Sequence, residues 1–508
     1  MSRHERIDRI GVVGTGAMGQ GIAQVAACAG LDVYLFDSRP GAAEEARERI
    51  AVELHRQVER GRLDPEGAVC ALAGLRPVDE LARLGDCQLV IEAIVEDLDA
   101  KQALFRQLES LLDGGAILAS NTSSLSITAI ASTCADPGRV AGLHFFNPVP
   151  RMRLVEVIPG LITRADVTER LVELARTLGH KPVRAKDTPG FIVNHAGRAY
   201  GTEALRILGE GVAQPAEVDV LLRDGAGFRM GPFELLDLIG LDVSLPVMES
   251  VYRQYYEEPR YRPHPLLRQM LAAGHLGRKS GRGFHVYPPE PVVDAIAPSR
   301  TEPLPPVWLA ADDEVAGQRL RALLERLGAR LENGERPSAR ALCLLAPLGD
   351  DATQAALRLA LDPERVVAID VLAELDAHRC LMPTPATRPT WLLAARTLLT
   401  GDGAQVTVIR DSAGFVVQRT LASIVNLGCD IAQQGIATAA DIDLAVRLGL
   451  GYPMGPLEWG DRLGPARVLL ILERLHELSG DPRYRPSPWL RRRARLGLSL
   501  RHDNQGES

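Results

Sequence analysis

The chain consists of short apolar runs separated by glycine, proline and charged positions. Residues 9–14 predict a short buried strand, the alanine-rich residues 20–29 predict a helix, and residues 32–36 predict a second strand. Residues 116–119 form another apolar run, which ends in a polar loop and predicts a further strand. No apolar run approaches the ~20 residues that a membrane-spanning helix needs, so we expect no membrane span.

The first strand and the first helix are joined by the glycine-rich motif GTGAMG, and Asp37 follows the second strand. This order of strand, GxGxxG, helix, strand and acid predicts a dinucleotide-binding βαβ unit; a purely structural glycine turn is the alternative. The glycines permit a tight turn close to a pyrophosphate, and the helix N-terminus offers free N–H groups. Asp37 can accept hydrogen bonds from both ribose hydroxyls and would repel a 2′-phosphate, so we expect NAD rather than NADP. The predicted cofactor contacts in the loop are Gly14, Gly16, Ala17, Met18 and Gly19.

A histidine and a glutamate lie twelve residues apart in the segment GLHFFNPVPRMRLVEVI. His144 ends an apolar run, and the alternation of residues 151–158 places Glu156 on a strand face with apolar neighbours. Pro148 and Pro150 indicate a chain reversal between His144 and Glu156, and a hairpin-like return would bring the two side chains into contact. Either residue alone is more often a satisfied core or surface group. Beside a dinucleotide site, however, Glu156 would hold one ring nitrogen of His144 and leave the other free as a general base.

Two further polar residues are candidates for the same site. Ser123 lies in the loop after the strand predicted at 116–119, where it would bond a substrate oxygen or cap a helix that begins near Ile127. Asn194 follows four apolar residues and would face a cleft or cap a turn. The sequence leaves both alternatives open for each residue.

The second half of the chain repeats part of the first. KDTPGFIVN at residues 186–194 matches RDSAGFVVQ at 410–418, and MGPFE matches MGPLE at the same offset. A match of this length predicts a duplicated helical domain, which we place at residues 185–287 and 409–508.

The repeat indicates the domain organisation. We expect an α/β fold in which a Rossmann-type NAD-binding domain at residues 1–184 precedes the first all-α domain. Seven prolines predict an extended linker at residues 288–306. The apolar run 341–345 and the similarity of RVVAID to RVAGLH predict a degenerate Rossmann-like segment at 307–408, ahead of the second helical copy.

Composition narrows the functional classes. A chain of 508 residues is too long for a single core, and a net charge of −7 without a basic block gives no reason to expect a nucleic-acid partner. The seven cysteines are scattered and form no CxxC, so we expect reduced thiols and neither disulfides nor a metal site. The N-terminal residues lack the apolar segment of a signal peptide, and a cytoplasmic location is therefore expected.

Residues 7–287, approximately, resemble the L-3-hydroxyacyl-CoA dehydrogenase family of β-oxidation enzymes. The motifs that carry the resemblance occur in the family's order and are GVVGTGAMGQGIA, VEDLDAKQALF, ASNTSSLSI, GLHFFNPVPRMRLVEVI, DTPGFIVN and GRKSGRGFHVY. The second helical copy and the overall length resemble the long subgroup tied to aerobic phenylacetate catabolism, whose substrate is 3-hydroxyadipyl-CoA.

The resemblance implies roles for individual residues. His144 would be the general base with Glu156 as its partner. Ser123 and Asn194 would hold the C3 oxygen and the thioester region of the substrate. The residues implied near the nicotinamide and its ribose are Glu96, Lys101, Ser123, Asn147 and Lys279.

The family attaches the CoA moiety partly through a lysine-bearing helical hairpin after the second strand. In this chain residues 47–62 carry arginines and His55 in place of lysines. The candidates for electrostatic contacts with the CoA phosphates are therefore Arg56, Arg60 and Arg62.

The second copy departs from the family pattern. No GxGxxG precedes it, Asp370 replaces the histidine, Gln418 replaces Asn194, and the apolar Leu381 falls roughly where Glu156 would map. We therefore expect one active site per chain. Because the helical domains of the family pair across a dimer, we expect the second copy to pack on the first and imitate that partner; a homodimer of the whole chain stays an open alternative.

These observations together predict NAD-dependent oxidation of an L-3-hydroxyacyl-CoA to a 3-ketoacyl-CoA, with 3-hydroxyadipyl-CoA as the favoured substrate. One alternative is a short-chain 3-hydroxybutyryl-CoA dehydrogenase of fatty-acid or butanoate metabolism. Another is a dehydrogenase of hydroxy acids that carry no CoA. A nucleotide-sensing protein without activity is a third alternative, against which the complete set of polar residues in the first copy argues.

Overall fold

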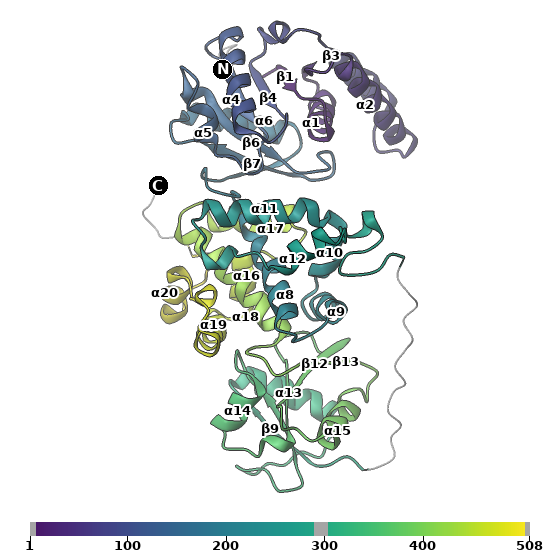
Figure 1. The fold of residues 1–508 in the computed structure, drawn as a ribbon, viewed down its shortest axis with the longest axis vertical. Coiled ribbons are helices and arrows are strands. Elements are labelled where there is room, and N and C mark those ends of the chain that lie inside the picture. Colours follow the sequence, from purple (N-terminus) through teal and green to yellow (C-terminus); the bar gives the residue numbers. More distant parts are fainter. Residues whose placement is uncertain (1–6, 289–302, 503–508) are drawn as a thin grey trace. The chain divides into compact units, whose positions relative to one another are not determined.

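The computed structural model describes residues 7–288 and 303–502, which form two compact units (Figure 1). The first unit runs to His195 and also takes in Gln434–Gly451 from the second half of the chain. The second unit holds Ala196–Gln433 and the residues from Tyr452 onward. Residues 289–302, most of the predicted proline-rich linker, lie outside the described residues.

The first unit is built on an eight-stranded sheet of order β3-β2-β1-β4-β5-β6-β7-β8, in which only the β6–β7 pair is antiparallel. Its strands are β1 (Arg9–Val13), β2 (Asp32–Phe36), β3 (Leu75–Pro77), β4 (Leu89–Glu92), β5 (Ile117–Ser120), β6 (Val140–Phe145), β7 (Leu154–Pro159) and β8 (Lys181–Arg184). Its helices are α1 (Ala17–Cys28), α2 (Ala42–Glu59), α3 (Pro65–Gly74), α4 (Leu98–Leu111), α5 (Ile127–Ala131), α6 (Ala165–Thr177) and α17 (Ala439–Gly449), with α7 (Val193–Ala196) at its end. The α/β prediction and its first two strands are confirmed, whereas the first helix begins at Ala17, three residues earlier than the alanine-rich run indicates.

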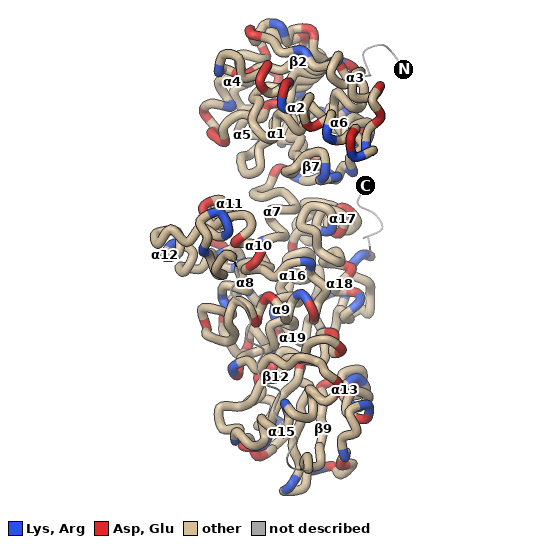
Figure 2. Tube along the Cα trace, turned by 90° about the vertical axis from the view of Figure 1, so that its right-hand side faces the viewer, with Lys and Arg blue, Asp and Glu red and all other residues tan. Residues whose placement is uncertain are grey.

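The central strands β1 and β4 are buried on both faces, as expected of parallel strands covered by helices on each side. Helix α2 illustrates how the covering helices pack. Its Ala46, Ile50 and Leu54 are buried, while its charged residues lie on the outer surface, where Figure 2 shows both signs along the helix. The sheet therefore provides a rigid frame whose carboxyl ends carry the loops of the candidate site.

The second unit combines two helical copies with a second sheet. The first copy comprises α8 (Arg198–Gly209), α9 (Pro215–Ala226), α10 (Pro232–Ile239), α11 (Leu241–Gln254) and α12 (Leu266–Ala272). The second copy contributes α16 (Val416–Gln433), α18 (Pro456–Leu463), α19 (Pro465–Ser479) and α20 (Pro488–Leu496). The second sheet has the order β13-β12-β11-β10-β9 and consists of β9 (Val307–Ala311), β10 (Leu342–Ala346), β11 (Val366–Ile369), β12 (His378–Pro383) and β13 (Gln405–Val408), with α13 (Glu314–Arg326), α14 (Ala352–Arg358) and α15 (Pro389–Leu399).

The second sheet reproduces the antiparallel pair of the first. Strands β11 and β12 run antiparallel and β12 and β13 parallel, as do β6–β7 and β7–β8. The register corrects one sequence assignment, since Leu381 pairs with Ile369 and the residue opposite Asp370 is Cys380, whose carbonyl accepts the Asp370 N–H at 3.1 Å. Cys380 thus occupies the position that corresponds to Glu156.

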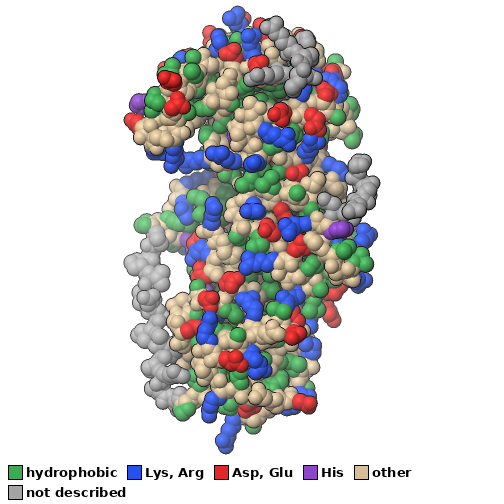
Figure 3. Space-filling view, turned by 180° about the vertical axis from the view of Figure 1, so that it is seen from behind, with side chains coloured by type: hydrophobic (Ala, Val, Ile, Leu, Met, Phe, Trp, Pro, Cys, Tyr) green, Lys and Arg blue, Asp and Glu red, His purple; other side chains and the backbone are tan. Residues whose placement is uncertain are grey.

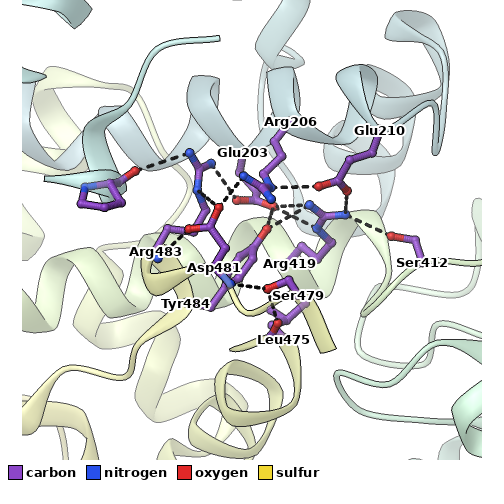
Figure 4. Close-up of polar contacts among 11 residues, drawn as sticks. Glu203, Arg206, Glu210, Ser412, Arg419, Leu475, Ser479, Asp481, Arg483 and Tyr484 are labelled. Carbon is purple, nitrogen blue, oxygen red and sulfur yellow. Dashed lines mark hydrogen bonds and ion pairs between the residues drawn. The ribbon is translucent and has the colours of Figure 1, made fainter. Parts of the chain in front are cut away.

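The two helical copies pack on each other within the second unit, chiefly through α8 and α16. A buried charge network joins them (Figure 4): the Arg419 guanidinium donates to Glu203 at 2.9 Å, to Glu210 at 2.8 Å and to the Tyr484 hydroxyl at 2.9 Å. The Tyr484 hydroxyl in turn donates to Glu203 at 2.7 Å. The network ties the first copy to the second by charge as well as by apolar packing.

Helix α17 belongs to the second copy in sequence but to the first unit in space. It packs on β7 and β8, and the Lys186 N–H donates to the Ile436 carbonyl at 2.9 Å just before the helix. In the second unit the helix at the corresponding place in the first copy, α9, packs on β12. Each helical copy therefore supplies a helix to the sheet of the other half, an exchange that the sequence pattern did not indicate.

Candidate active site

His144 and Glu156 face each other directly across β6 and β7. Nδ1 of His144 lies 2.7 Å from Oε2 of Glu156, and only 5% of the histidine and none of the glutamate is exposed. The other carboxylate oxygen accepts the backbone N–H groups of Ile192 at 2.9 Å and Val193 at 3.0 Å. Both oxygens of Glu156 are thus engaged, which fixes the carboxylate and leaves Nε2 of His144 as the ring nitrogen not held by it. The contact predicted from the strand pattern is present.

The loop after β5 contains Ser123, whose backbone N–H donates to Glu96 Oε1 at 2.9 Å and whose hydroxyl lies 3.4 Å from the same oxygen. The cap of α5 is Ser126, which accepts from the Ala129 N–H, so Ser123 is not the helix cap. Asn194, in α7, donates from its amide nitrogen to the Ser123 carbonyl at 3.3 Å. The structure therefore brings Ser123, Asn194 and Glu96 together in the first unit.

Lys101 lies beneath this loop with 1% exposure. Its Nζ is 3.3 Å from Glu96 Oε2 and 2.5 Å from Oε1 of Glu92, a residue that the sequence analysis missed. Burial opposes ionisation of Glu96, but the Thr122 hydroxyl and the Lys101 charge hold the pKa of Glu96 below its usual range. The sequence does carry a signal for Glu92, which is its position. It is a glutamate at the end of the apolar run that forms β4, the strand beside β1 and its glycine loop.

The glycine loop has the geometry of an anion cradle. Gly14 adopts φ +94°, a conformation that favours glycine, and Gly16 caps α1 without a side-chain hydrogen bond. No described atom lies within 4 Å of the place where a Cβ on Gly16 would stand, so the approach to the helix N-terminus is open. The residues present therefore fit a dinucleotide whose pyrophosphate lies against this turn.

Asp37, which follows β2, holds the glycine loop by hydrogen bonds to Thr15. Its Oδ2 accepts from the Thr15 N–H and the Thr15 hydroxyl, each at 2.8 Å, and its Oδ1 accepts from the Arg39 N–H at 3.0 Å. Burial opposes ionisation, yet these hydrogen bonds keep the pKa of Asp37 below its ordinary value. The carboxylate is consequently held at the end of the strand where a ribose would be recognised.

A hollow of about 590 Å³ in the first unit lies between α1, the end of α2 and the loop that begins at Asn147. In Figure 3, Lys and Arg side chains gather along the lower edge of the first unit, which is the upper part of the view. The basic residues that line the hollow are Arg49, Arg60, Arg62, Arg151 and Arg153. Of the predicted phosphate contacts, Arg60 and Arg62 line the hollow and Arg56 does not. The Nη1 atom of Arg56 lies 3.8 Å from Oε2 of Glu53.

Lys279, the remaining predicted contact, lies in the second unit, where its ammonium is 2.5 Å from Asp242. Among the described residues no group of three or more His, Cys, Asp or Glu side chains is arranged to hold a metal ion. No helix in the described ranges is long and apolar enough to span a membrane.

Two family models match the chain. The NAD-binding domain of 3-hydroxyacyl-CoA dehydrogenase matches residues 9–188, and the C-terminal domain of 3-hydroxyacyl-CoA dehydrogenase matches twice, at 190–287 and 414–506. The double match agrees with the duplication inferred from the sequence.

Individual proteins resemble the chain over different lengths. The 3-hydroxyadipyl-CoA dehydrogenase of Escherichia coli (strain K12) is 41% identical over 501 residues, 96% of this chain and 98% of that protein. The 3-hydroxybutyryl-CoA dehydrogenase of Mycobacterium tuberculosis is 42% identical over 285 residues, which cover 56% of this chain and 99% of the relative. A crystal structure of 3-hydroxybutyryl-CoA dehydrogenase from Escherichia coli K12 superposes with a TM-score of 0.85 at 39% identity, over 97% of this chain and 99% of that one.

Proposed function

Because the chain belongs to the 3-hydroxyacyl-CoA dehydrogenase family, we propose that it oxidises the C3 hydroxyl of an L-3-hydroxyacyl-CoA to a ketone with NAD⁺. The observation that carries the proposal is the buried His144–Glu156 pair at 2.7 Å, in the same unit as the glycine loop and at the carboxyl end of its sheet. Ligands of open α/β sheets bind at that end.

His144 would act as the general base. With Nδ1 held by Glu156, Nε2 takes the proton of the C3 hydroxyl, and the adjacent carboxylate stabilises the imidazolium that forms. Bound NAD⁺ supplies the acceptor for the hydride that leaves C3, so one C–H bond and one O–H bond break and a C=O bond forms. The pair therefore provides the proton acceptor that this reaction needs.

The other predicted residues would orient substrate and cofactor. Ser123 and Asn194 would hold the C3 oxygen and the thioester region, and their mutual contact at 3.3 Å supports a shared role. Asp37 would accept hydrogen bonds from the adenosine ribose. The residues of the first unit that we assign to the nicotinamide side are Glu96, Lys101, Ser123 and Asn147.

The arginine-lined hollow is the site that we propose for the CoA phosphates. Guanidinium groups suit phosphate because they donate paired hydrogen bonds and keep their charge. Replacement of Arg60 by Ala should raise the KM for the thioester about tenfold or more, with a larger effect at low salt, and leave NADH affinity unchanged. The matched control is Arg56→Ala, outside the hollow. Equal effects of the two substitutions would contradict this assignment.

The identity of the substrate's acyl group can be tested by comparing the rates of NADH formation from 3-hydroxyadipyl-CoA, 3-hydroxybutyryl-CoA and the corresponding free hydroxy acids. We infer the adipyl thioester, and with it a role in phenylacetate catabolism, from the match over nearly the whole length to a protein named for that substrate. A preference for the butyryl thioester would favour short-chain fatty-acid or butanoate metabolism. Oxidation of the free hydroxy acids would contradict the proposal that the substrate is a CoA thioester.

We further infer one active site per chain, with the second helical copy packed on the first in the place of a partner's helical domain. The buried Arg419–Glu203 network between the copies supports this inference, as does the replacement of the catalytic pair by Asp370 and Cys380 in the second half. An expressed fragment of residues 1–287 that stays a stable and fully active monomer would contradict it. The seven free cysteines support a cytoplasmic location.

A further inference from the structure

Glu92 ends β4 and is completely buried, yet three donors converge on its carboxylate. Lys101 Nζ lies 2.5 Å from Oε1, the Ile94 N–H donates to Oε1 at 2.7 Å, and the Ser120 hydroxyl donates to Oε2 at 2.6 Å. Burying a carboxylate and an ammonium costs several kcal/mol each unless they are paired and hydrogen-bonded. Such an arrangement in the interior of a sheet therefore calls for an explanation beyond packing.

The place of Glu92 in the sheet points to the active site. In the strand register it lies between Val13 of β1, which leads into the glycine loop, and Ser120 of β5, which leads into the loop of Ser123. This is the carboxyl end of the parallel strands, where bound ligands lie in folds of this kind. Apolar neighbours on the same strand, Val90 and Ile91, already fill the core.

Two routes connect Glu92 to the turn at 122–124. On one, Lys101 spans from Glu92 to Glu96, whose Oε1 accepts from the Thr122 hydroxyl at 2.6 Å and the Ser123 N–H at 2.9 Å. On the other, Ser120 donates to Glu92 while its hydroxyl oxygen accepts the Thr122 N–H at 3.2 Å. Both routes end on the same few residues.

We propose that Glu92 is a positioning residue: it holds Lys101 and Ser120, and through them fixes the Glu96 carboxylate and the turn that presents Ser123. The proposal rests on the proposed function, in which Ser123 orients the C3 oxygen. Without the Glu92 charge, the buried ammonium keeps Glu96 as its carboxylate partner and draws it away from the amide of Ser123. A displacement of about 1 Å at a substrate-orienting group can cost on the order of 10²-fold in rate.

The test uses the full chain with Glu92→Gln, which keeps the size of the side chain and removes its charge, and Glu92→Asp, which keeps the charge. For Glu92→Gln we expect kcat to fall about 10- to 100-fold. We also expect the amides of residues 122–124 to lose at least tenfold in protection from hydrogen exchange, measured by mass spectrometry. Glu92→Asp should recover most of both. The exchange measurement does not depend on turnover, so it tests Glu92 even if no thioester reacts with the wild type and the proposed function fails.

The matched control is Asp402→Asn, which removes the partner of another fully buried cation, Arg379, at 2.6 Å in the second sheet. It should lower the unfolding midpoint without changing kcat or the exchange of residues 122–124. If Glu92→Gln behaves like this control, Glu92 is purely structural and the proposal is wrong. Should Glu92→Gln not fold, Glu92→Gln combined with Lys101→Met removes the unpaired charge; wild-type kcat and exchange in that variant would equally overturn the proposal.

Discussion

The Nδ1 atom of His144 and the Oε2 atom of Glu156 lie 2.7 Å apart between directly paired positions of antiparallel strands. Because β6 and β7 are the antiparallel pair of an otherwise parallel sheet, the chain can return at once and place a histidine and a glutamate side by side at a strand end. The same pairing in the second sheet holds Asp370 opposite Cys380, a pair that cannot supply a general base of this kind.

Replacement of His144 by Gln should lower kcat by about 10²–10⁴-fold, because general base catalysis contributes on this scale. Binding of NADH, followed by its fluorescence, should persist because the glycine loop is unaltered. The control is His476→Gln, at an exposed histidine of the second unit, which should retain full activity. An unchanged kcat in the His144 variant would remove this residue from the mechanism.

Asp370 should make the protein less stable as the pH rises. Burial raises the pKa of its carboxyl above the ordinary value, against opposing hydrogen bonds from Gln418 and the backbone. The folded state then binds more protons than the unfolded state, so stability is fully present below about pH 3.9, the usual Asp pKa, and declines as the pH passes through the raised value. Asp370→Asn should therefore raise the unfolding midpoint by a few degrees at neutral pH and flatten its pH dependence in calorimetry.

At Asp402 we expect the opposite pH dependence of stability, because the pKa of this carboxyl is lowered rather than raised. Hydrogen bonds from Arg379 lower the pKa of Asp402 to about 2, so its contribution is present above the usual Asp pKa and is lost as the pH falls through about 2. Asp402→Asn should lower the midpoint at neutral pH, with the difference vanishing in strong acid. Parallel pH profiles for the two Asn variants would contradict the assignment of both shifts.

Gly449, at the end of α17, should tolerate no larger side chain. A Cβ there would stand 2.8 Å from Val193 and 3.0 Å from Leu154, and the Val193 N–H is one of the groups that hold Glu156. Gly449→Val should cost about 1–3 kcal/mol of unfolding free energy through overpacking, and should also lower kcat.

The control for Gly449 is Gly114→Val in the same unit, where no described atom lies within 4 Å of the added Cβ. This substitution should change stability by less than about 0.5 kcal/mol. If both variants keep wild-type kcat, α17 does not support the His144–Glu156 pair.

Arg419→Met should destabilise the second unit by about 3–5 kcal/mol, because the buried Glu203 carboxylate loses its guanidinium partner at 2.8 Å and keeps only the more distant Arg483 at 3.7 Å. Denaturant unfolding measures the effect, and adding Glu203→Met should recover much of the loss. The contrasting pair is Arg176 with Glu173, whose side chains are 63% and 70% exposed, where Arg176→Met should cost at most about 1 kcal/mol. Similar losses from both arginines would show that burial of the network is unimportant.

The sequence by itself determined the glycine loop, the acid after β2, the duplication and the His144–Glu156 contact. Each of these rests on local information: glycine conformational freedom, strand alternation, a short return between neighbouring strands, and direct repetition of residues. Short-range rules of this kind also gave the fold class, and the match to family models confirms it.

Only the tertiary structure decided that Glu92 lies beneath the Ser123 loop, that Cys380 rather than Leu381 opposes Asp370, and that α17 packs on β7 and β8. A slip of one residue in strand register changes which side chains meet, and a single sequence carries no sharp signal for that register. The exchange of α17 and the convergence of arginines from α2 and the β6–β7 loop depend on contacts between segments far apart in the chain. Such contacts are selected by the packing of the whole unit, which no local pattern encodes.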